Sequence, residues 1–397
     1  KLFEVHPILK GTIELYQECG LALFRHDDMK IEIPVYNLSE KEWENQKNQL
    51  VKPYMYSKGE PLYHIGIYNV EGDKYLFIDV AHVISDGMTF GILLRNINKL
   101  YAGEEVKKET YTFYEYILDD QHRSNSKLRF NSELYFKKMM DGLRIERTIL
   151  NRKNNGDLTC ETNAVIHDKF NELKFDAVNA FCHKNGVSKN ILFLTAFNYC
   201  VGLFADKDDV ISTSIHNGRT DSRWYHVVGP LYMTYYHRYT RVPHETVPEL
   251  LQKSANQILK TMDKPVSNIR ADEMFFQYQG EIMNINEIGN APAEIIRLNL
   301  DATPFHLQVM ANDNGYFYEL RYWENRYERK QLEIFMNCYK SILQAMMIEK
   351  SVRRLKYYIE VKDKPLYFYT EAGKINFLRC VSSFASEQVM LEAVLAQ

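Results

Sequence analysis

A short stretch, residues 82–87, carries side chains that could move a proton. His82 is followed four residues later by Asp86, and Gly87 comes directly after it. An imidazole can accept and return a proton near neutral pH, as a general base does. A nearby carboxylate can fix the geometry of a turn, and a glycine lets the backbone approach a ligand closely. These residue types therefore suit acid–base chemistry on a bound ligand.

The elements around this stretch are expected to hold it at the end of a strand. Residues 62–70 and 74–80 are rich in apolar, β-branched and aromatic residues and predict a hairpin, whose second strand delivers His82. Residues 88–101 repeat apolar side chains at helical spacing and stop before Gly103. A lone histidine is more often a half-buried structural side chain, so the rest of the chain has to decide.

The remaining periodicity predicts a mixture of helices and strands, and Pro7 indicates that a short first helix stops near His6. Helices are expected over residues 40–52, 132–143, 174–185, 190–204, 245–262 and 328–347. Strands are expected over residues 11–18, 21–25, 31–35, 210–215, 274–278, 295–300, 305–310 and 316–322.

The pattern His-x-x-x-Asp-Gly after a buried strand resembles the active-site motif of the condensation domains of nonribosomal peptide synthetases. Chloramphenicol acetyltransferase, carnitine acyltransferases and plant BAHD acyltransferases belong to the same superfamily. Condensation domains usually carry two adjacent histidines; here Ala81 replaces the first and His82 keeps the second. The resemblance implies an α/β (α+β) fold with two chloramphenicol acetyltransferase-like lobes in a V, and an active site midway along the tunnel between them.

Further family motifs follow in the expected order over nearly all of residues 1–350. Residues 227–238 resemble the family's Ile-Gly-x-Phe-Val-Asn-Thr-x-x-x-Arg motif, with Met233 where asparagine is usual. The other matching elements are His6-Pro7-Ile8-Leu9-Lys10, the tyrosine-rich residues 111–118, Tyr135-Phe136 in an amphipathic helix, and Met262-Asp263-Lys264-Pro265. An ordered series of motifs is far more specific than the hexapeptide alone.

Composition excludes several other classes of protein. A hydrophobic content of 45% and an aromatic content of 13% are typical of a globular chain, and a net charge of −3 gives no basic signature for nucleic acid. The six cysteines form no Cys-x-x-Cys pair, and the twelve histidines form no metal-ligand cluster. No signal peptide or membrane-spanning run is recognisable, and the apolar residues 191–205 fit a core helix. We expect a cytoplasmic protein with reduced thiols.

A chain of 397 residues is too long for one small core and predicts two lobes, with a polar, turn-rich boundary at residues 150–162. The tail is strand-like over 375–384 and helix-like over 386–397, as the family's first strand and helix are. We therefore expect a circular permutation, or an exchange between two chains, that brings Gln397 close to Lys1; a fused segment is the alternative. The predicted lobes are residues 1–160 plus 356–397, which carry the motif, and residues 161–355.

The resemblance implies direct acyl transfer, in which His82 takes or orients the proton of the attacking group. The first interpretation is a condensation-type acyltransferase that joins a carrier-bound acyl or aminoacyl thioester to an amine, forming an amide in nonribosomal peptide synthesis. The alternatives are a stand-alone acyl-coenzyme A-dependent N- or O-acyltransferase and a degenerate domain that only recruits a carrier protein. The donor would be phosphopantetheine on a carrier protein, or coenzyme A, with no tightly bound cofactor and no metal. The sequence contains no Gly-x-Ser-x-Gly nucleophile elbow.

Other site residues are named by the same resemblance. Asp86 is expected to form a structural ion pair with Arg219 of the His216-Asn217-Gly218-Arg219 stretch, with Arg238 as the second candidate. A backbone N–H at Gly87 could bind the developing oxyanion. Ser85 is expected either to contribute a hydroxyl near the oxyanion or to stabilise the turn. Tyr232 and Thr234 are expected to line the tunnel, and the alternative for Tyr232 is a simple aromatic side chain in a strand.

Overall fold

The computed structural model describes residues 1–17, 20–56, 58–124, 126–142, 162–205, 207–242, 244–262, 264, 274–282, 287–289, 291–293, 304–358, 366–369 and 375–378. Contacts between residues divide the chain into two compact units. The first comprises Lys1–Asn125, Asn217–Tyr232 and Ile285–Ile295. The second comprises Ser126–His216, Met233–Asn284 and Ile296–Gln397.

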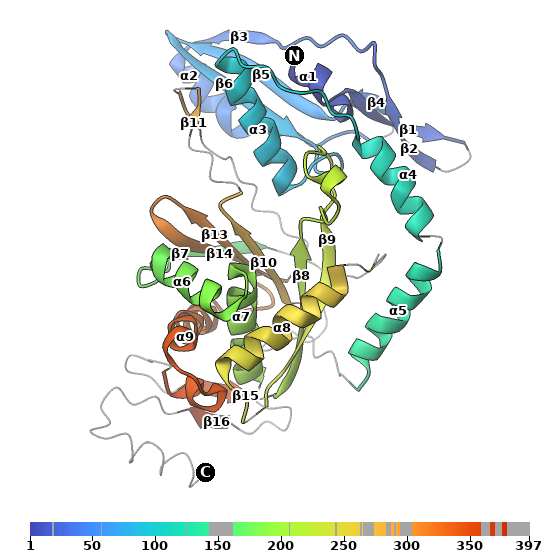
Figure 1. Ribbon diagram of the computed structural model, residues 1–397. Helices are drawn as coiled ribbons and strands as arrows, with labels where there is room; N and C mark the ends of the chain where they lie inside the picture. The colour runs from blue at the N-terminus through green and yellow to red at the C-terminus, as the bar shows by residue number, and fades with distance from the viewer. Residues whose placement is uncertain are drawn as a thin grey trace. The chain divides into compact units, whose positions relative to one another are not determined.

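The described part of the first unit contains two three-stranded sheets (Figure 1). One has the order β2-β1-β4, formed by Gly20–Arg25, Gly11–Tyr16 and Lys58–Pro61. The other has the order β3-β5-β6, formed by Val35–Leu38, Tyr63–Val70 and Asp73–Val80. The α-helices are α1 (Leu2–Val5), α2 (Glu40–Gln46), α3 (Gly87–Tyr101) and α4 (Phe113–Ser124). The short elements are η1 (Pro7–Lys10), η2 (Lys47–Gln49), η3 (Ser222–Trp224), β11 (Glu287–Ile288) and β12 (Ala291–Pro292).

The predicted hairpin that leads to His82 is confirmed as β5–β6. Its strands pair antiparallel from Tyr63 opposite Val80 to Val70 opposite Asp73. The two loop residues between them, Glu71 and Gly72, have φ of 48° and 110°. Tight hairpin turns with two positive φ angles match the right-handed twist of the strands, and glycine adopts such angles without steric penalty.

Helix α3 packs on the β5–β6 sheet through its apolar face. A small apolar pocket remains beside them, lined by Leu2, Leu9, Ile65, Ile78, Val80, Phe90, Leu93, Leu94 and Ile97. Asp86 is the N-cap of the helix, and its side chain accepts a hydrogen bond from the Thr89 amide at 2.7 Å. An aspartate at this position satisfies one of the unpaired N–H groups of the first turn. The loop between strand and helix is therefore anchored at both ends.

The second unit is built on a six-stranded sheet with the order β7-β14-β13-β10-β8-β9. The strands are β7 (Asn163–Lys169), β8 (Asp209–His216), β9 (Met233–Thr240), β10 (Met274–Gly280), β13 (Phe305–Asn312) and β14 (Gly315–Trp323). Strand β10 runs parallel to β8 and β13, and the other neighbours are antiparallel. The helices are α5 (Lys127–Met140), α6 (Phe175–Asn185), α7 (Lys189–Ala205), α8 (Val247–Met262), α9 (Arg329–Ile348) and η4 (Val352–Tyr358).

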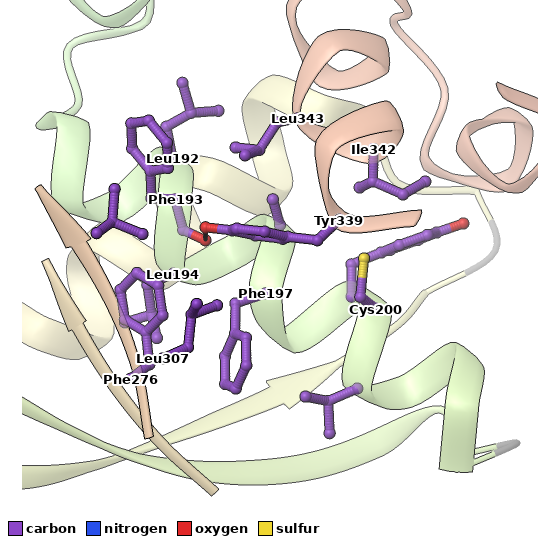
Figure 2. Packing of buried hydrophobic residues seen from close by; sticks show 14 of the residues in the cluster. Leu192, Phe193, Leu194, Phe197, Cys200, Phe276, Leu307, Tyr339, Ile342 and Leu343 are labelled. Carbon is purple, nitrogen blue, oxygen red and sulfur yellow. Dashed lines mark hydrogen bonds between the residues drawn. The ribbon is translucent and has the colours of Figure 1, made fainter. Parts of the chain in front are cut away.

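Helix α7 is the centre of the second unit's core, as the apolar run predicted. Thirteen of its seventeen residues are buried, so it is covered on all sides rather than along one stripe. Figure 2 shows Phe193 and Phe197 of α7 between the sheet and α9. The Tyr339 hydroxyl on α9 donates to the Phe193 carbonyl at 3.0 Å, which satisfies a polar group in this apolar environment. Burial raises the pKa of the Cys200 thiol well above its usual range, so this cysteine is a packing residue.

Across the described residues, no helix on its own combines the length and the apolar character needed to cross a membrane. The bent pair α6 and α7 passes that test when its two helices are taken together, by length and composition only.

The predicted lobe boundaries and this division of contacts differ in four places. Residues 126–142 and the described tail residues from 356 onward group with the second unit, whereas 217–232 and 285–295 group with the first. The described part of the tail forms strands β15 (Leu366–Tyr369) and β16 (Ile375–Leu378), which pair with each other, and β15 contacts α7. The predicted strand at 295–300, residues 150–161 of the predicted boundary and the predicted helix at 386–397 lie outside the described residues. The permutation that would bring Gln397 to Lys1 stays a prediction.

A buried histidine in the second unit leads to a pH-dependent stability. His237 on β9 is 1% exposed, and its Nδ1 accepts a hydrogen bond from Asn198 of α7 at 3.0 Å. Burial, with a smaller contribution from the positive charge of Lys253, lowers its pKa from 6.5 to about 3. Below pH 6.5 the unfolded chain takes up a proton that the folded chain refuses, so the free energy of unfolding falls as the pH falls towards 3.

We expect His237 to contribute a loss of about 2 kcal/mol in the free energy of unfolding between pH 7 and pH 5, measured by urea denaturation. Carboxylates stay ionised in both states over most of this window, but the half-buried His216, with a pKa lowered by desolvation to about 4, adds in the same direction. The variant His237→Gln should therefore show a shallower pH dependence, whatever its absolute stability. Equal slopes for the variant and the wild type would contradict a neutral buried imidazole.

Candidate active site

The loop that carries His82 follows β6 directly, and a serine of the same loop, Ser85, stabilises it by hydrogen bonds to its backbone. The Ser85 hydroxyl donates to the carbonyl of Ala81 at 3.0 Å and also approaches that of Val80 at 3.3 Å. Ser85 is buried, whereas His82 is exposed. The hydroxyl therefore stabilises the turn, which is one of the two roles considered from the sequence.

Asp86 lies in the same loop and is 7% exposed. Besides capping α3, its carboxylate accepts hydrogen bonds from Arg219 at 2.9 and 3.2 Å and from the Leu231 amide at 3.0 Å. With the Thr89 amide, four donors surround one buried carboxylate. Such an arrangement compensates for the loss of water around the charge. The carboxylate is fully engaged and faces protein rather than a ligand.

Arg219 is the partner that the sequence proposed, and its side chain is completely buried. Its guanidinium binds Asp86 with two nitrogens and also donates to the carbonyls of Val227 at 3.0 Å and Gly229 at 3.2 Å. The second candidate, Arg238, instead pairs with Asp209 in the second unit. Arg219 thus joins the His82 loop to residues 217–232 by charge and by backbone hydrogen bonds.

Two further side chains hold the same stretch of backbone, and the sequence analysis did not identify them. The Thr89 hydroxyl exchanges two hydrogen bonds with the backbone of Gly229, both at 2.9 Å. A carboxylate oxygen of Glu109 accepts the Val228 amide at 2.8 Å. Glu109 stands among charged residues that are typical of a solvated loop, so no sequence signal marked it. Thr89 was hidden within an otherwise apolar helical pattern.

The stretch that these hydrogen bonds hold leads to Tyr232, which lies beside the exposed imidazole of His82. The rings of Tyr232 and His82 form an edge-to-face pair, with ring centroids 5.6 Å apart and planes at 72°. Tyr232 is 40% exposed, so both rings remain accessible. Gly87 is the first residue of α3, where backbone N–H groups have no intrahelical acceptor. Thr234 belongs to β9 of the second unit, and its part in the site stays a prediction.

The group in this arrangement that can act as an acid or a base is the imidazole of His82. An accessible imidazole stands on a loop whose backbone is fixed by a buried ion pair, so its position is set before any ligand binds. Among the described residues there is no group of three or more histidine, cysteine, aspartate or glutamate side chains suited to hold a metal ion.

Comparisons with known proteins agree with the motif. The family model described as "Condensation domain" matches residues 1–364. Surfactin synthase subunit 1 of Bacillus subtilis (strain 168) is 24% identical over 231 residues, which is 58% of this chain and 6% of that protein. Gramicidin S synthase 2 of Aneurinibacillus migulanus is 19% identical over 353 residues, which is 83% of this chain and 8% of that protein. The chain thus spans less than a tenth of these curated relatives.

Solved structures share the fold. The condensation domain of the monacolin K polyketide synthase superposes with a TM-score of 0.72 at 15% sequence identity, covering 88% of each chain. At this identity the likeness concerns the fold, and it agrees with the mixed α/β architecture of both units.

Proposed function

Because the chain belongs to the condensation-domain family, we propose that it forms an amide bond between an acyl or aminoacyl thioester and an amine. The observation that carries this proposal is the exposed His82 on a loop anchored by the buried Asp86–Arg219 pair. An accessible base on a rigid support can take the proton that the amine nitrogen must lose as it bonds to the carbonyl carbon.

In the proposed reaction, the amine nitrogen attacks the thioester carbonyl and passes its proton to His82. The carbon–sulfur bond then breaks, and the departing thiolate takes up the proton that His82 accepted, which gives the free thiol and restores the neutral imidazole. The N–H of Gly87, in the first turn of α3, is the donor that we assign to the developing oxyanion. Tyr232 would pack against the imidazole or the substrate beside it. Asp86 and Arg219 hold the loop and do not exchange protons with the substrate.

We propose phosphopantetheine on a carrier protein as the acyl donor, in nonribosomal peptide synthesis. Two alternatives follow from the departures at Ala81 and Met233. One is transfer from coenzyme A to an amine or alcohol, and the other is a non-catalytic domain that recruits a carrier protein. The exposed imidazole beside an exposed aromatic ring favours a catalytic role over recruitment alone.

The test offers the purified protein a panel of acyl-carrier and acyl-coenzyme A thioesters with amine and alcohol acceptors. We expect turnover with a carrier-bound donor and an amine, and a fall in kcat of about 10²- to 10⁴-fold in His82→Ala, because general-base catalysis contributes this much. The matched control is His122→Ala, which removes an exposed histidine in the last turn of α4. Product formation is followed by mass spectrometry.

Each outcome separates the candidates. Turnover with coenzyme A thioesters alone would favour the stand-alone acyltransferase. Carrier binding without turnover, unchanged in His82→Ala, would favour recruitment. Activity that survives intact in His82→Ala would reject the imidazole as the base, whichever donor is used.

A further inference from the structure

We propose that His6 and Glu109 form a buried positioning pair that sets the backbone of residues 227–231, and through it Tyr232, against the His82 loop. The inference rests on the proposed function for its catalytic consequence. It concerns side chains that do not touch the reacting atoms. Both lie in the first unit and are almost completely buried, with exposed side-chain fractions of 2% for His6 and 4% for Glu109.

The pair is fixed by hydrogen bonds on both sides of the imidazole. His6 Nδ1 lies 2.9 Å from Glu109 Oε1, and the Asn96 amide on α3 donates to Nε2 at 2.8 Å. The ring therefore uses Nδ1 as donor and Nε2 as acceptor, and both nitrogens are satisfied. The Glu109 amide also donates to the Val5 carbonyl at 3.1 Å. Side chain and backbone together tie the loop before α4 to the chain that follows α1.

The carboxylate oxygen that binds the imidazole also binds the segment beside the site. Glu109 Oε1 accepts the Val228 amide at 2.8 Å, so one atom connects His6 to residues 217–232. The other oxygen, Oε2, is buried and has no hydrogen-bond partner among the described residues. A buried carboxylate oxygen without a partner is unfavourable. Oε1 therefore makes the hydrogen bonds of this carboxylate among the described residues.

Side chains bind five backbone polar groups of residues 227–231, in addition to two hydrogen bonds between backbone groups. Arg219 binds the carbonyls of Val227 and Gly229, Thr89 binds both polar groups of Gly229, and Asp86 accepts the Leu231 amide. Asp86 and Thr89 stand at the start of α3, and Arg219 lies earlier in the same stretch, residues 217–232. Glu109 supplies a contact from a different element, the loop between α3 and α4. It thereby fixes where the segment lies relative to the His82 loop.

The change that tests this role is Glu109→Gln, which preserves shape and removes charge. A glutamine has one acceptor oxygen, and its NH₂ group cannot accept the proton of either His6 Nδ1 or Val228. The shared oxygen loses its charge, and both hydrogen bonds to it weaken because a neutral amide is a poorer acceptor than a carboxylate. The matched control is Glu115→Gln, six residues away, whose carboxylate binds only Thr112 among the hydrogen bonds of the described residues.

The first readout is amide hydrogen exchange of a peptide spanning residues 227–232, measured by mass spectrometry. We expect Glu109→Gln to speed exchange there about tenfold, because opening of the segment becomes easier, while peptides from β5 and β6 stay unchanged. Glu115→Gln should leave the 227–232 peptide as in the wild type. Unchanged exchange in folded Glu109→Gln would overturn the inference, with or without any enzymatic activity.

The second readout is the split between kcat and KM. We expect kcat of Glu109→Gln to fall about ten- to hundredfold with KM nearly constant, because misplacement near a reacting group affects the chemical step. Glu109→Asp keeps the carboxylate on a shorter side chain, serves as the conservative variant and should retain more of kcat than Glu109→Gln. A wild-type kcat in Glu109→Gln would refute the positioning role.

The two failures are distinguishable. An inactive wild type with faster exchange in Glu109→Gln would count against the proposed function and support the pair. If Glu109→Gln does not fold, Asn96→Ala is the milder variant, since it removes only the hydrogen bond to His6 Nε2. It should speed exchange in the 227–232 peptide to a smaller extent, and no change there would again refute the inference.

Discussion

Replacing Arg219 with methionine is expected to lower the free energy of unfolding by about 3–5 kcal/mol, because it leaves a buried carboxylate without its charge partner. The Asp86 and Arg219 side chains have exposed fractions of 5% and 0%. Water cannot replace the guanidinium at such depth without local opening. Urea denaturation followed by circular dichroism measures the loss, and the first unit is expected to unfold earlier.

The matched control lies four residues away in the same segment. Arg223 is 53% exposed and forms ion pairs with Asp221 and Asp119. Exposed pairs contribute about 0–1 kcal/mol, so Arg223→Met should change stability little. Arg219→Lys keeps the charge but loses the two-nitrogen contact and should fall between the two. Similar losses for Arg219→Met and Arg223→Met would contradict a buried, stabilising pair.

Local patterns in the sequence were sufficient for the elements around the site. The β5–β6 hairpin, α3 and α7 follow from apolar periodicity and from residues such as Gly72 at the turn. These features depend on neighbours within a few positions, which is where periodicity and turn chemistry operate. Arg219 came from the family resemblance, because nothing local to Arg219 specifies a carboxylate partner 133 positions earlier.

The side chains that support the loop were missed for the same physical reason. His6 was interpreted as the end of a helix, and α1 does end at Val5. Its hydrogen bond to Glu109 spans 103 positions and depends on tertiary packing alone. The grouping of residues 217–232 with the first unit likewise follows from hydrogen bonds to Asp86, Thr89 and Glu109. The local sequence pattern does not predict hydrogen bonds between residues that lie so far apart along the chain.

The second large effect on stability is expected at Gly218, next to Arg219, where the backbone lies very close to the backbone of Leu231. Gly218 has φ of +69°, and a Cβ added there would lie 1.5 Å from the carbonyl oxygen of Leu231. Any side chain must therefore push the Leu231 backbone away and disturb the hydrogen bond that the Leu231 amide donates to Asp86. We expect Gly218→Ala to destabilise the protein by more than about 4 kcal/mol, since steric overlap with backbone adds to the strain of a positive φ.

Gly103 provides the control that separates these two contributions. It has a similar φ of +78°, but a Cβ added to Gly103 would meet no heavy atom within 4 Å. Gly103→Ala should therefore lose only the strain of the left-handed conformation, about 1–2 kcal/mol. The difference between the free energies of unfolding of the two variants, measured by urea denaturation, reports the contact with Leu231.

Because that contact positions the residue before Tyr232, Gly218→Ala should also lower kcat under conditions where it remains folded, whereas Gly103→Ala should not. Equal effects of the two substitutions would show that Gly218 and Leu231 do not approach each other as closely as the structure has them.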